Sequence, residues 1–236
     1  MIFLNDYFIK LMIMISINKS ASIGEDSIVE PNAIVGFRYH PQAGEAVIGR
    51  YGIIRMGTII YADVEFGDYL QTGHYAVIRA HVHGGDYCAI GNHSALEGLI
   101  ELGTGVRIMS HVYIPSRTKI GNNVFIGPGT IILNEKTPCR YGSPDAALSV
   151  PQGPVIEDDV FIGGGCTINP GITIGKRSFI ASGTLVTKDI PPDSLAKGSP
   201  VRFEPITENL RGENNRKLTQ NPYDIWHPEL PYKRPV

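Results

Sequence analysis

Large apolar residues recur at every sixth position along most of the chain. From Ile48 to Ile132, all but two of the residues in this register are large and apolar, and the exceptions are Thr72 and Gly84. The residue four places after each of them is small or β-branched in most repeats, and glycine is frequent directly after the large residue. The same register returns between Ile156 and Val186. This repeat is the dominant structural signal in the sequence.

A period of six excludes the two simplest elements, since an amphipathic helix repeats every 3.6 residues and a half-buried strand every two. Six residues with two inward positions instead give a short strand followed by a corner. Three such hexapeptides close one triangular coil, and each strand stacks in parallel on the coil before it. The pattern therefore predicts an all-β parallel β-helix of hexapeptide repeats, with about eight coils over residues 17–190. An N-terminal extension (1–16) and a C-terminal tail (191–236) flank it.

Two segments interrupt the register. The interval from Val35 to Ile48 is one residue longer than two hexapeptides, so one extra residue has to be absorbed between Phe37 and Glu45, in loop 37–45. The longer interruption, loop 134–154, leaves the repeats on its two sides in phase. Both segments are predicted to leave the prism, and loops on a rigid scaffold frequently carry binding and catalytic residues.

The composition excludes several classes of function. The net charge is −2, and no basic cluster is interleaved with aromatic residues, so binding to nucleic acid or to an anionic membrane is not expected. The apolar run 11–17 is too short to span a bilayer, and no small-residue cleavage site follows it. Three cysteines, Cys88, Cys139 and Cys166, have no metal-type spacing and cannot all pair, which favours a reduced, cytoplasmic protein.

The register and the end of the repeat together resemble the hexapeptide-repeat acyltransferases. Residues Thr187 to Pro192 and Ala196 to Arg202 are similar to the V-T-K-D-V-P and G-x-P-A-R sequences with which that family closes. The resemblance covers roughly residues 20–202 and implies a left-handed parallel β-helix with one catalytic-type loop excursion. It also implies a homotrimer with its sites between subunits.

A narrower resemblance concerns the substrate. Residues 124–128 (V-F-I-G-P) followed by 132–138 (I-L-N-E-K-T-P) are similar to the V-F-I-G-P … F-T-N-D-K-Y-P segment of N-acetyltransferases that act on UDP- or dTDP-linked amino sugars. The upstream stretches 54–61, 72–74 and 78–79 also resemble this group. The resemblance implies an acetyl-CoA-dependent N-acetyltransferase that acts on a nucleotide-linked amino sugar, for surface glycan or polysaccharide biosynthesis.

The segment departs from that pattern at Glu135, where the family has Asp, and at Thr137, where it has Tyr. The excursion after Asn134 contains no histidine, so the loop-borne catalytic His of sugar O-acetyltransferases with this fold has no counterpart there. This difference favours an amine over a hydroxyl acceptor. Because a free amine attacks a thioester readily, such an enzyme has to align its substrates, stabilise the oxyanion and provide a base for one proton.

The candidate catalytic residues are Asn134, Glu135 and His111. The Asn134 amide is expected to orient the amine or the tetrahedral centre, and Glu135 to hold a base or the substrate ammonium. His93 and His111 are three hexapeptides apart, so they should stack on successive coils, with His111 close enough to Asn134 to act as general base. The competing interpretations are a loop-entry Asx turn, an exposed carboxylate and a solvent-facing histidine.

Three further groups of residues follow from the resemblance. Pantetheine is expected to lie along the later coils beside small residues, namely Gly164, Ala181 and Ser182. The CoA phosphates need flexible cations at the groove mouth, for which the candidates are Lys188, Lys197 and Arg202. The acceptor nucleotide is expected on the earlier coils, with the candidates Arg55, His74 and Arg79. Ordinary solvation is the alternative for each basic residue.

Two rival functions come from other classes. A γ-type zinc carbonic anhydrase shares the β-helix but needs a His-x4-His pair, which the sequence lacks. His81 and His83 alternate on a strand-like stretch, so a two-ligand metal site stays open, although no metal is expected. The second rival is a non-catalytic β-helix that serves as an assembly scaffold. Among enzymes, the alternatives are other hexapeptide acyltransferases that transfer an acyl group to a sugar hydroxyl or to serine.

Overall fold

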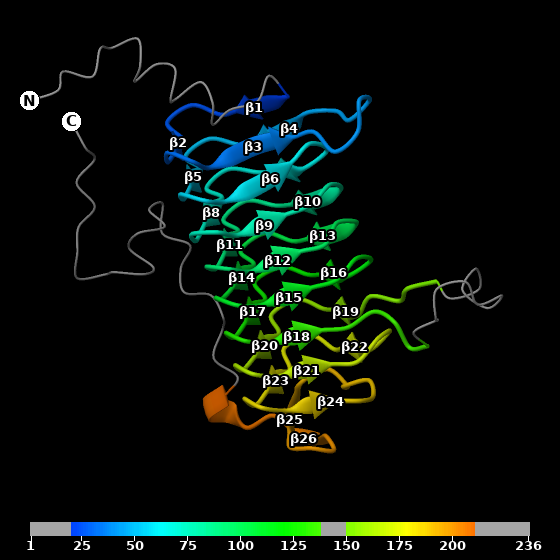
Figure 1. Ribbon diagram of the computed structural model, residues 1–236. Helices are drawn as coiled ribbons and strands as arrows, with labels where there is room; N and C mark the ends of the chain where they lie inside the picture. Colours follow the sequence, from blue (N-terminus) through cyan, green and yellow to red (C-terminus); the bar gives the residue numbers. More distant parts are fainter. Residues whose placement is uncertain (1–19, 138–149, 211–236) are drawn as a thin grey trace, which may run out of the picture.

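A triangular prism of short stacked strands forms the molecule (Figure 1). The computed structural model describes residues 20–137 and 150–210, and the predicted extension (1–16) lies outside them. Each coil contributes one strand to each of three sheets, which we call sheets I, II and III in the order in which the chain visits them. The edges are named after the sheets they join: I/II, II/III and III/I. The predicted all-β fold and its coil count are confirmed, since sheets I and III have eight strands each.

All neighbouring strands are parallel except the last pair of sheet II. Sheet I contains β1 (Ala21–Ile23), β4 (Ala46–Ile48), β7 (Glu65–Phe66), β10 (Val82–Gly84), β13 (Ile100–Leu102), β16 (Lys119–Ile120), β19 (Val155–Ile156) and β22 (Thr173–Ile174). Sheet II contains β2 (Ile28–Val29), β5 (Ile53–Ile54), β8 (Gln71–Thr72), β11 (Ala89–Ile90), β14 (Arg107–Ile108), β17 (Phe125–Ile126), β20 (Phe161–Ile162), β23 (Phe179–Ile180), β25 (Ser194–Lys197) and β26 (Arg202–Pro205). Sheet III contains β3 (Ile34–Phe37), β6 (Ile59–Tyr61), β9 (Val77–Ile78), β12 (Ala95–Leu96), β15 (Tyr113–Ile114), β18 (Ile131–Ile132), β21 (Thr167–Ile168) and β24 (Leu185–Val186).

The core consists of the large apolar residues of the six-residue register, which point into the prism and are almost completely buried. The two exceptions to the register have physical reasons. Thr72 Oγ1 accepts the Arg55 N–H at 2.9 Å and lies 3.0 Å from Thr58 Oγ1, so this buried hydroxyl has partners. A Cβ at Gly84 would lie 2.3 Å from the Phe66 ring. Glycine there makes room for the phenyl group of the preceding coil.

Residues with left-handed backbone angles turn the chain at all three edges, once per coil. At edge I/II, for example, they include Tyr51, Tyr69 and Tyr87, with φ between 58° and 64°. These tyrosine rings stack with centroids 4.8 and 4.6 Å apart, which is the spacing of neighbouring strands. Residues three hexapeptides apart therefore occupy equivalent places on successive coils.

Loop 37–45 is larger than the sequence suggests. Most strand partners are three hexapeptides apart in sequence, whereas Ala46, the partner of Ala21, lies seven positions further along. The first coil therefore contains a seven-residue insertion, and the prediction of one extra residue was wrong. The error arose because the segment from Val35 to Ile48 spans only one side of the prism. The insertion begins at a register shift between Val35 and Phe37, where Gly36 has φ +80°.

The second loop leaves the prism at the same edge. Lys119 pairs with Val155, two coil lengths later, so the segment between β18 and β19 inserts the length of one whole coil at edge III/I. Figure 1 shows loop 37–45 and the described ends of loop 134–154 projecting from one side of the prism. Within loop 134–154, residues 138–149 lie outside the described part.

Part of the predicted C-terminal tail is ordered structure. β25 extends sheet II in parallel on β23, and β26 returns antiparallel to it before a short 3-10 helix at Glu208–Leu210. Residues 211–236 lie outside the described part. In residues 20–137 and 150–210, no helix is long and apolar enough to cross a membrane.

Candidate functional site

Edge II/III carries a column of three stacked rings. Tyr75 stacks on His93 and His93 on His111, with both pairs of ring centroids 5.2 Å apart and the planes within 11° of parallel. All three residues have left-handed φ angles and occupy the same corner position of successive coils. The predicted stacking of His93 on His111 is confirmed. His111 is the last ring of the column and is exposed.

The same column continues below His111 with three glycines, Gly129, Gly165 and Gly183, which we call the glycine trough. Their φ angles are +69°, +67° and +72°, so they make the same turn as the rings above them. A Cβ added at any of the three would meet no described atom within 4 Å. The edge is therefore open over three successive coils directly below an exposed imidazole.

The small residues predicted for pantetheine lie on this edge. Gly164 precedes a trough residue, and its carbonyl oxygen accepts the N–H of Gly183 at 2.9 Å. Ala181 and Ser182 belong to the next coil, directly before Gly183, and Ser182 is exposed. The structure thus brings these three predicted residues together beside the trough.

Edge III/I carries Asn134 at the entry of the second loop. Its Nδ2 donates to the backbone oxygen and to the hydroxyl of Ser116, both at 3.1 Å. Because the NH2 group is used in this way, the atom that Asn134 can present to a ligand is its acceptor oxygen, Oδ1. An acceptor oxygen suits an amine N–H better than an oxyanion, and both predicted roles of Asn134 stay predictions.

Glu135 is exposed beside sheet III. Burial raises the pKa of Tyr113, the charge of Glu97 raises it further, and Glu135 acts in the same direction while Arg79 opposes it. The carboxylate of Glu135 is thus close enough to Tyr113 to act on it electrostatically. Asn134 and Glu135 together present acceptor oxygens at this edge.

Comparison with known proteins identifies the family. Residues 100–134 and 153–188 match the family model described as bacterial transferase hexapeptide (six repeats). The chain belongs to the hexapeptide-repeat acyltransferase superfamily. It is 31% identical to the bifunctional protein GlmU of Geotalea uraniireducens over 184 residues, which are 77% of this chain and 35% of GlmU. It is 39% identical to the galactoside O-acetyltransferase of Escherichia coli over 83 residues, which are 35% of this chain and 41% of that protein.

A solved structure shares the fold of this hexapeptide-repeat protein over nearly its whole length. LpxA from Bacteroides fragilis, a UDP-N-acetylglucosamine acyltransferase, superposes with a TM-score of 0.62 at 18% identity and covers 93% of this chain and 91% of its own. The expected left-handed β-helix is thereby confirmed. The chain spans less than half the length of the curated relatives it matches.

The hexapeptide-repeat prism does not bring His111 and Asn134 together within one chain. His111 lies at edge II/III and Asn134 at edge III/I, on opposite sides of sheet III. Along the prism axis the two residues are only one coil apart, because Asn134 is on the coil of Gly129, directly below the coil of His111. The two edges can form one site only where different copies of the chain meet.

The candidate nucleotide partners are also divided between the edges. Arg55 and His74 belong to edge II/III, and Arg79 belongs to edge III/I. Arg55 Nη1 lies 2.6 Å from Glu30 Oε1, and Arg79 Nη1 lies 2.7 Å from Glu97 Oε2. Each arginine is thus ion-paired on an early coil before any ligand binds.

The three candidate cations for the CoA phosphates lie beyond the last coil. Lys188 Nζ is 5.0 Å from the centroid of the Phe203 ring. Lys197 Nζ is 2.7 Å from Glu204 Oε1, in an ion pair that is exposed to solvent. Arg202 begins β26 and is exposed. They gather at the C-terminal end of the prism, towards which the glycine trough runs.

The two histidines considered for a metal have different partners. His83 Nδ1 lies 3.6 Å from Glu65 Oε2 on sheet I, whereas His81 Nε2 lies 3.0 Å from the hydroxyl of Tyr39. In residues 20–137 and 150–210, no three His, Cys, Asp or Glu side chains are grouped as metal ligands. The contact of His81 with Tyr39 and Asp63 was missed by the sequence analysis, although Asp63 and His81 are three hexapeptides apart and hence on one column.

Proposed function

We propose that this protein is an acetyl-CoA-dependent N-acetyltransferase that acts on the amine of a nucleotide-linked amino sugar, for surface glycan or polysaccharide biosynthesis. The observation that carries the proposal is the glycine trough below His111. Side chains are missing at the same corner of three successive coils. From His111 to Gly183 this corner runs roughly 14 Å at the usual strand spacing. A narrow chain such as pantetheine can lie there with its thioester at the imidazole.

The acceptor side of the proposal rests on edge III/I. Asn134 Oδ1 and the Glu135 carboxylate are acceptors for the N–H groups of an amine or ammonium. The resemblance of residues 124–128 and 132–138 to nucleotide-sugar N-acetyltransferases supplies the substrate class. A hydroxyl acceptor is the second candidate, since one relative is named galactoside O-acetyltransferase.

We also propose that the protein is a homotrimer whose sheet III faces the threefold axis. The outward side chains of sheet III are uncharged: Ile34, Ile59, Val77, Ala95, Tyr113, Ile131, Thr167 and Leu185. Sheet I instead presents charges, among them Glu65, Glu101 and Lys119. In a closed ring built this way, edge II/III of one copy meets edge III/I of the next. His111 and the glycine trough would then face Asn134 of a neighbour.

The transfer would proceed by direct attack. The amine nitrogen adds to the thioester carbon, the C–S bond breaks, and the proton lost by the nitrogen passes through a base to the CoA sulfur. His111 is placed to hold that proton, and alignment of the substrates supplies much of the rate. Buried free thiols at Cys88 and Cys166 fit the proposed cytoplasmic location.

The test is release of free thiol from acetyl-CoA in the presence of UDP- and dTDP-linked amino sugars. The matched controls are the same nucleotide sugars with a hydroxyl in place of the amine. Thiol release with the amines alone supports the proposal. Release with the hydroxyl compounds instead would assign the second candidate, and release with neither, together with no binding of CoA in calorimetry, would favour a non-catalytic scaffold.

A further inference from the structure

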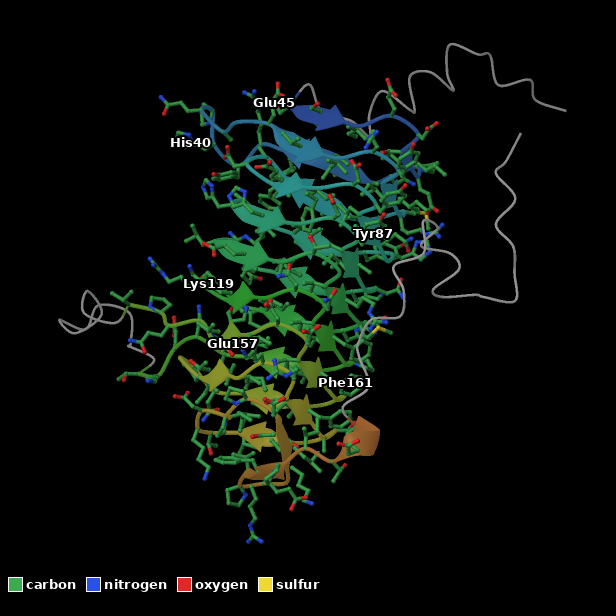
Figure 2. All side chains as sticks on the ribbon, turned by 180° about the vertical axis from the view of Figure 1, so that it is seen from behind. His40, Glu45, Tyr87, Lys119, Glu157 and Phe161 are labelled. Carbon is green, nitrogen blue, oxygen red and sulfur yellow. The ribbon has the colours of Figure 1, made fainter. Side chains whose placement is uncertain are left out.

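Loop 37–45 folds onto the coils below it and places Tyr39 against two residues of edge III/I. The Tyr39 hydroxyl lies 2.9 Å from Asp63 Oδ2 and 3.0 Å from His81 Nε2. The loop is the upper of the two that project in Figure 1, and Figure 2 labels His40 and Glu45 in it, across the molecule from Tyr87. Nothing in the proposed acetyl transfer uses this cluster.

The cluster is held from several directions. Asp63 Oδ1 accepts the N–H of Gly44 at 2.7 Å, so the carboxylate binds both arms of the loop. The ring of Tyr39 lies edge-on to the His81 imidazole, with centroids 6.2 Å apart. Phe37 packs edge-on against Tyr61 at 5.0 Å. The three polar side chains therefore have a fixed geometry on the protein surface.

This geometry determines where the protons lie. Burial alone would raise the pKa of Asp63, but the hydrogen bonds from Tyr39 and Gly44, with the nearby His81, lower it below the ordinary value. The hydrogen bond to Asp63 raises the pKa of Tyr39, with burial and the carboxylate charge acting in the same direction. At neutral pH the carboxylate is thus ionised and the phenol protonated, and the single hydroxyl proton of Tyr39 points to Asp63.

The tautomer of His81 follows from this arrangement. Since the Tyr39 proton is used, its oxygen can only accept a hydrogen bond from His81, and Nε2 must carry the hydrogen. The other ring nitrogen, Nδ1, then has a free lone pair when the imidazole is neutral. His81 is exposed. It therefore offers a hydrogen-bond acceptor of fixed orientation beside exposed rings, since Phe37 is 39% and Tyr39 46% exposed.

Further down the same edge lies an exposed cation, Arg117. His81, Leu99 and Arg117 form one column on successive coils, so Arg117 stands two coils below His81, and Asn134, whose Nδ2 donates to Ser116, lies on the next coil. Arg117 is exposed, and its guanidinium has no partner among the described residues. From His81 to the coil of Asn134 this edge spans roughly 14 Å at the usual strand spacing.

We propose that edge III/I binds the acceptor nucleotide lengthwise, with His81 Nδ1 accepting a hydrogen bond from the ring N–H of a uracil, thymine or guanine base and Arg117 against the diphosphate. The base lies on the exposed rings of Phe37 and Tyr39, because aromatic side chains hold bases by stacking. The sugar amine then reaches Asn134 and Glu135. His81 sets the base preference, and Tyr39 and Asp63 are the residues that position it.

The order of groups along the edge matches the order of groups in such a ligand. Aromatic surface and acceptor nitrogen come first, a cation follows, and acceptor oxygens for the amine come last. Cytosine and adenine have no ring N–H on their pairing edge, so their acceptor nitrogen would face the lone pair of Nδ1. Only the placement of the sugar amine rests on the proposed acetyltransferase function. Binding of the nucleotide can be tested without any transfer reaction.

The experiment compares UDP and CDP, which differ in the base only at positions 3 and 4, by titration calorimetry with the full chain. UDP is expected to bind at least tenfold more tightly than CDP. His81→Ala should reduce this ratio to near one, and His83→Ala, two residues away on sheet I, should leave it unchanged. Arg117→Gln should weaken both ligands about tenfold and keep their ratio. Equal binding of UDP and CDP, or binding of neither, would overturn the proposal.

A second measurement is independent of ligands. Nitrogen-15 NMR of the imidazoles should show His81 as the Nε2–H tautomer, and Tyr39→Phe should abolish this preference and lower the UDP to CDP ratio. An Nδ1–H tautomer in the wild type would contradict the assignment. The proposed function and the proposed nucleotide site can be contradicted independently. UDP binding without thiol release would contradict the transferase function alone. The nucleotide site alone would be contradicted if thiol release were equal for UDP- and CDP-amino sugars and unchanged in His81→Ala.

Discussion

His111 lies flat on His93, with ring centroids 5.2 Å apart and ring planes 6° from parallel. The stacking follows from one rule of the fold, since residues three hexapeptides apart occupy the same corner of successive coils. Below His111 the same corner holds glycine on three coils, so the imidazole ends the column and overlooks the trough. If the trough holds pantetheine, His111 is the first side chain that the thioester meets.

Filling the glycine trough should weaken acetyl-CoA binding. Gly165→Leu places a bulky side chain in space that is otherwise open. We expect KM for acetyl-CoA to rise at least tenfold with a smaller change in kcat. Gly165→Ala is the matched control, because it has the same left-handed backbone cost of about 1 kcal/mol without the bulk. Equal KM values for the two variants would show that the donor lies elsewhere.

Removing the imidazole at the end of the column should slow the chemical step. General base catalysis contributes on the order of 10²–10⁴-fold, so His111→Ala is expected to lower kcat by at least 10²-fold and to change the acidic limb of the pH profile. Tyr75→Ala, at the other end of the column, is the control and should keep the wild-type kcat and pH profile. A normal kcat and an unchanged pH profile in His111→Ala would exclude the base role.

Asn134 is expected to act through its acceptor oxygen. Asn134→Ala removes Oδ1 and should raise KM for the amino sugar about tenfold, with KM for acetyl-CoA unchanged. Asn134→Asp keeps acceptor oxygens and should retain more amine binding than Asn134→Ala, although it loses the donor bonds to Ser116. Initial-rate kinetics with each substrate varied in turn separate the two effects. A larger loss in Asn134→Asp would mean that the amide NH2 is the important group.

The core makes a prediction that does not depend on function. Gly84→Leu should lower the free energy of unfolding by about 1–3 kcal/mol, because its side chain overlaps the Phe66 ring. Phe66→Ala alone should also destabilise the protein, by leaving a cavity. The double variant should be more stable than the sum of the two effects predicts. Denaturant unfolding of all four proteins measures this coupling, and strict additivity would contradict the packing described for this coil.

The period predicted the parts of the structure that depend only on register. It predicted the prism, its buried positions and the stacking of His93 on His111, because inward positions and coil length follow from the spacing of residues. It did not predict that His111 and Asn134 occupy different edges. In sequence the two residues are separated by one coil and most of one further side of the prism. They therefore lie close together along the prism axis but on different edges.

The features that the sequence did not predict lie mostly in the loops and at the edge from which they leave the prism. The seven-residue insertion was counted as one because seven residues are one hexapeptide plus one, so the phase of the register alone reveals a single extra residue. The contacts of Tyr39 with Asp63 and His81 depend on how loop 37–45 folds back, and no periodic pattern determines that path. Arg117 was overlooked because an isolated basic residue at a corner carries no motif, and only its position on the edge between His81 and Asn134 suggests a role.

The proposed trimer can be tested with two matched substitutions. Ile131 on sheet III and Val155 on sheet I are both outward-facing and similarly exposed, at 46% and 40%. If sheet III faces the threefold axis, Ile131→Glu buries a charge at the interface, which is costly without a partner. We expect light scattering to show a monomer for Ile131→Glu and a trimer for Val155→Glu. Activity should be lost with the trimer, because His111 and Asn134 lie on opposite edges of sheet III and meet only between copies, so a fully active monomer would contradict the shared site.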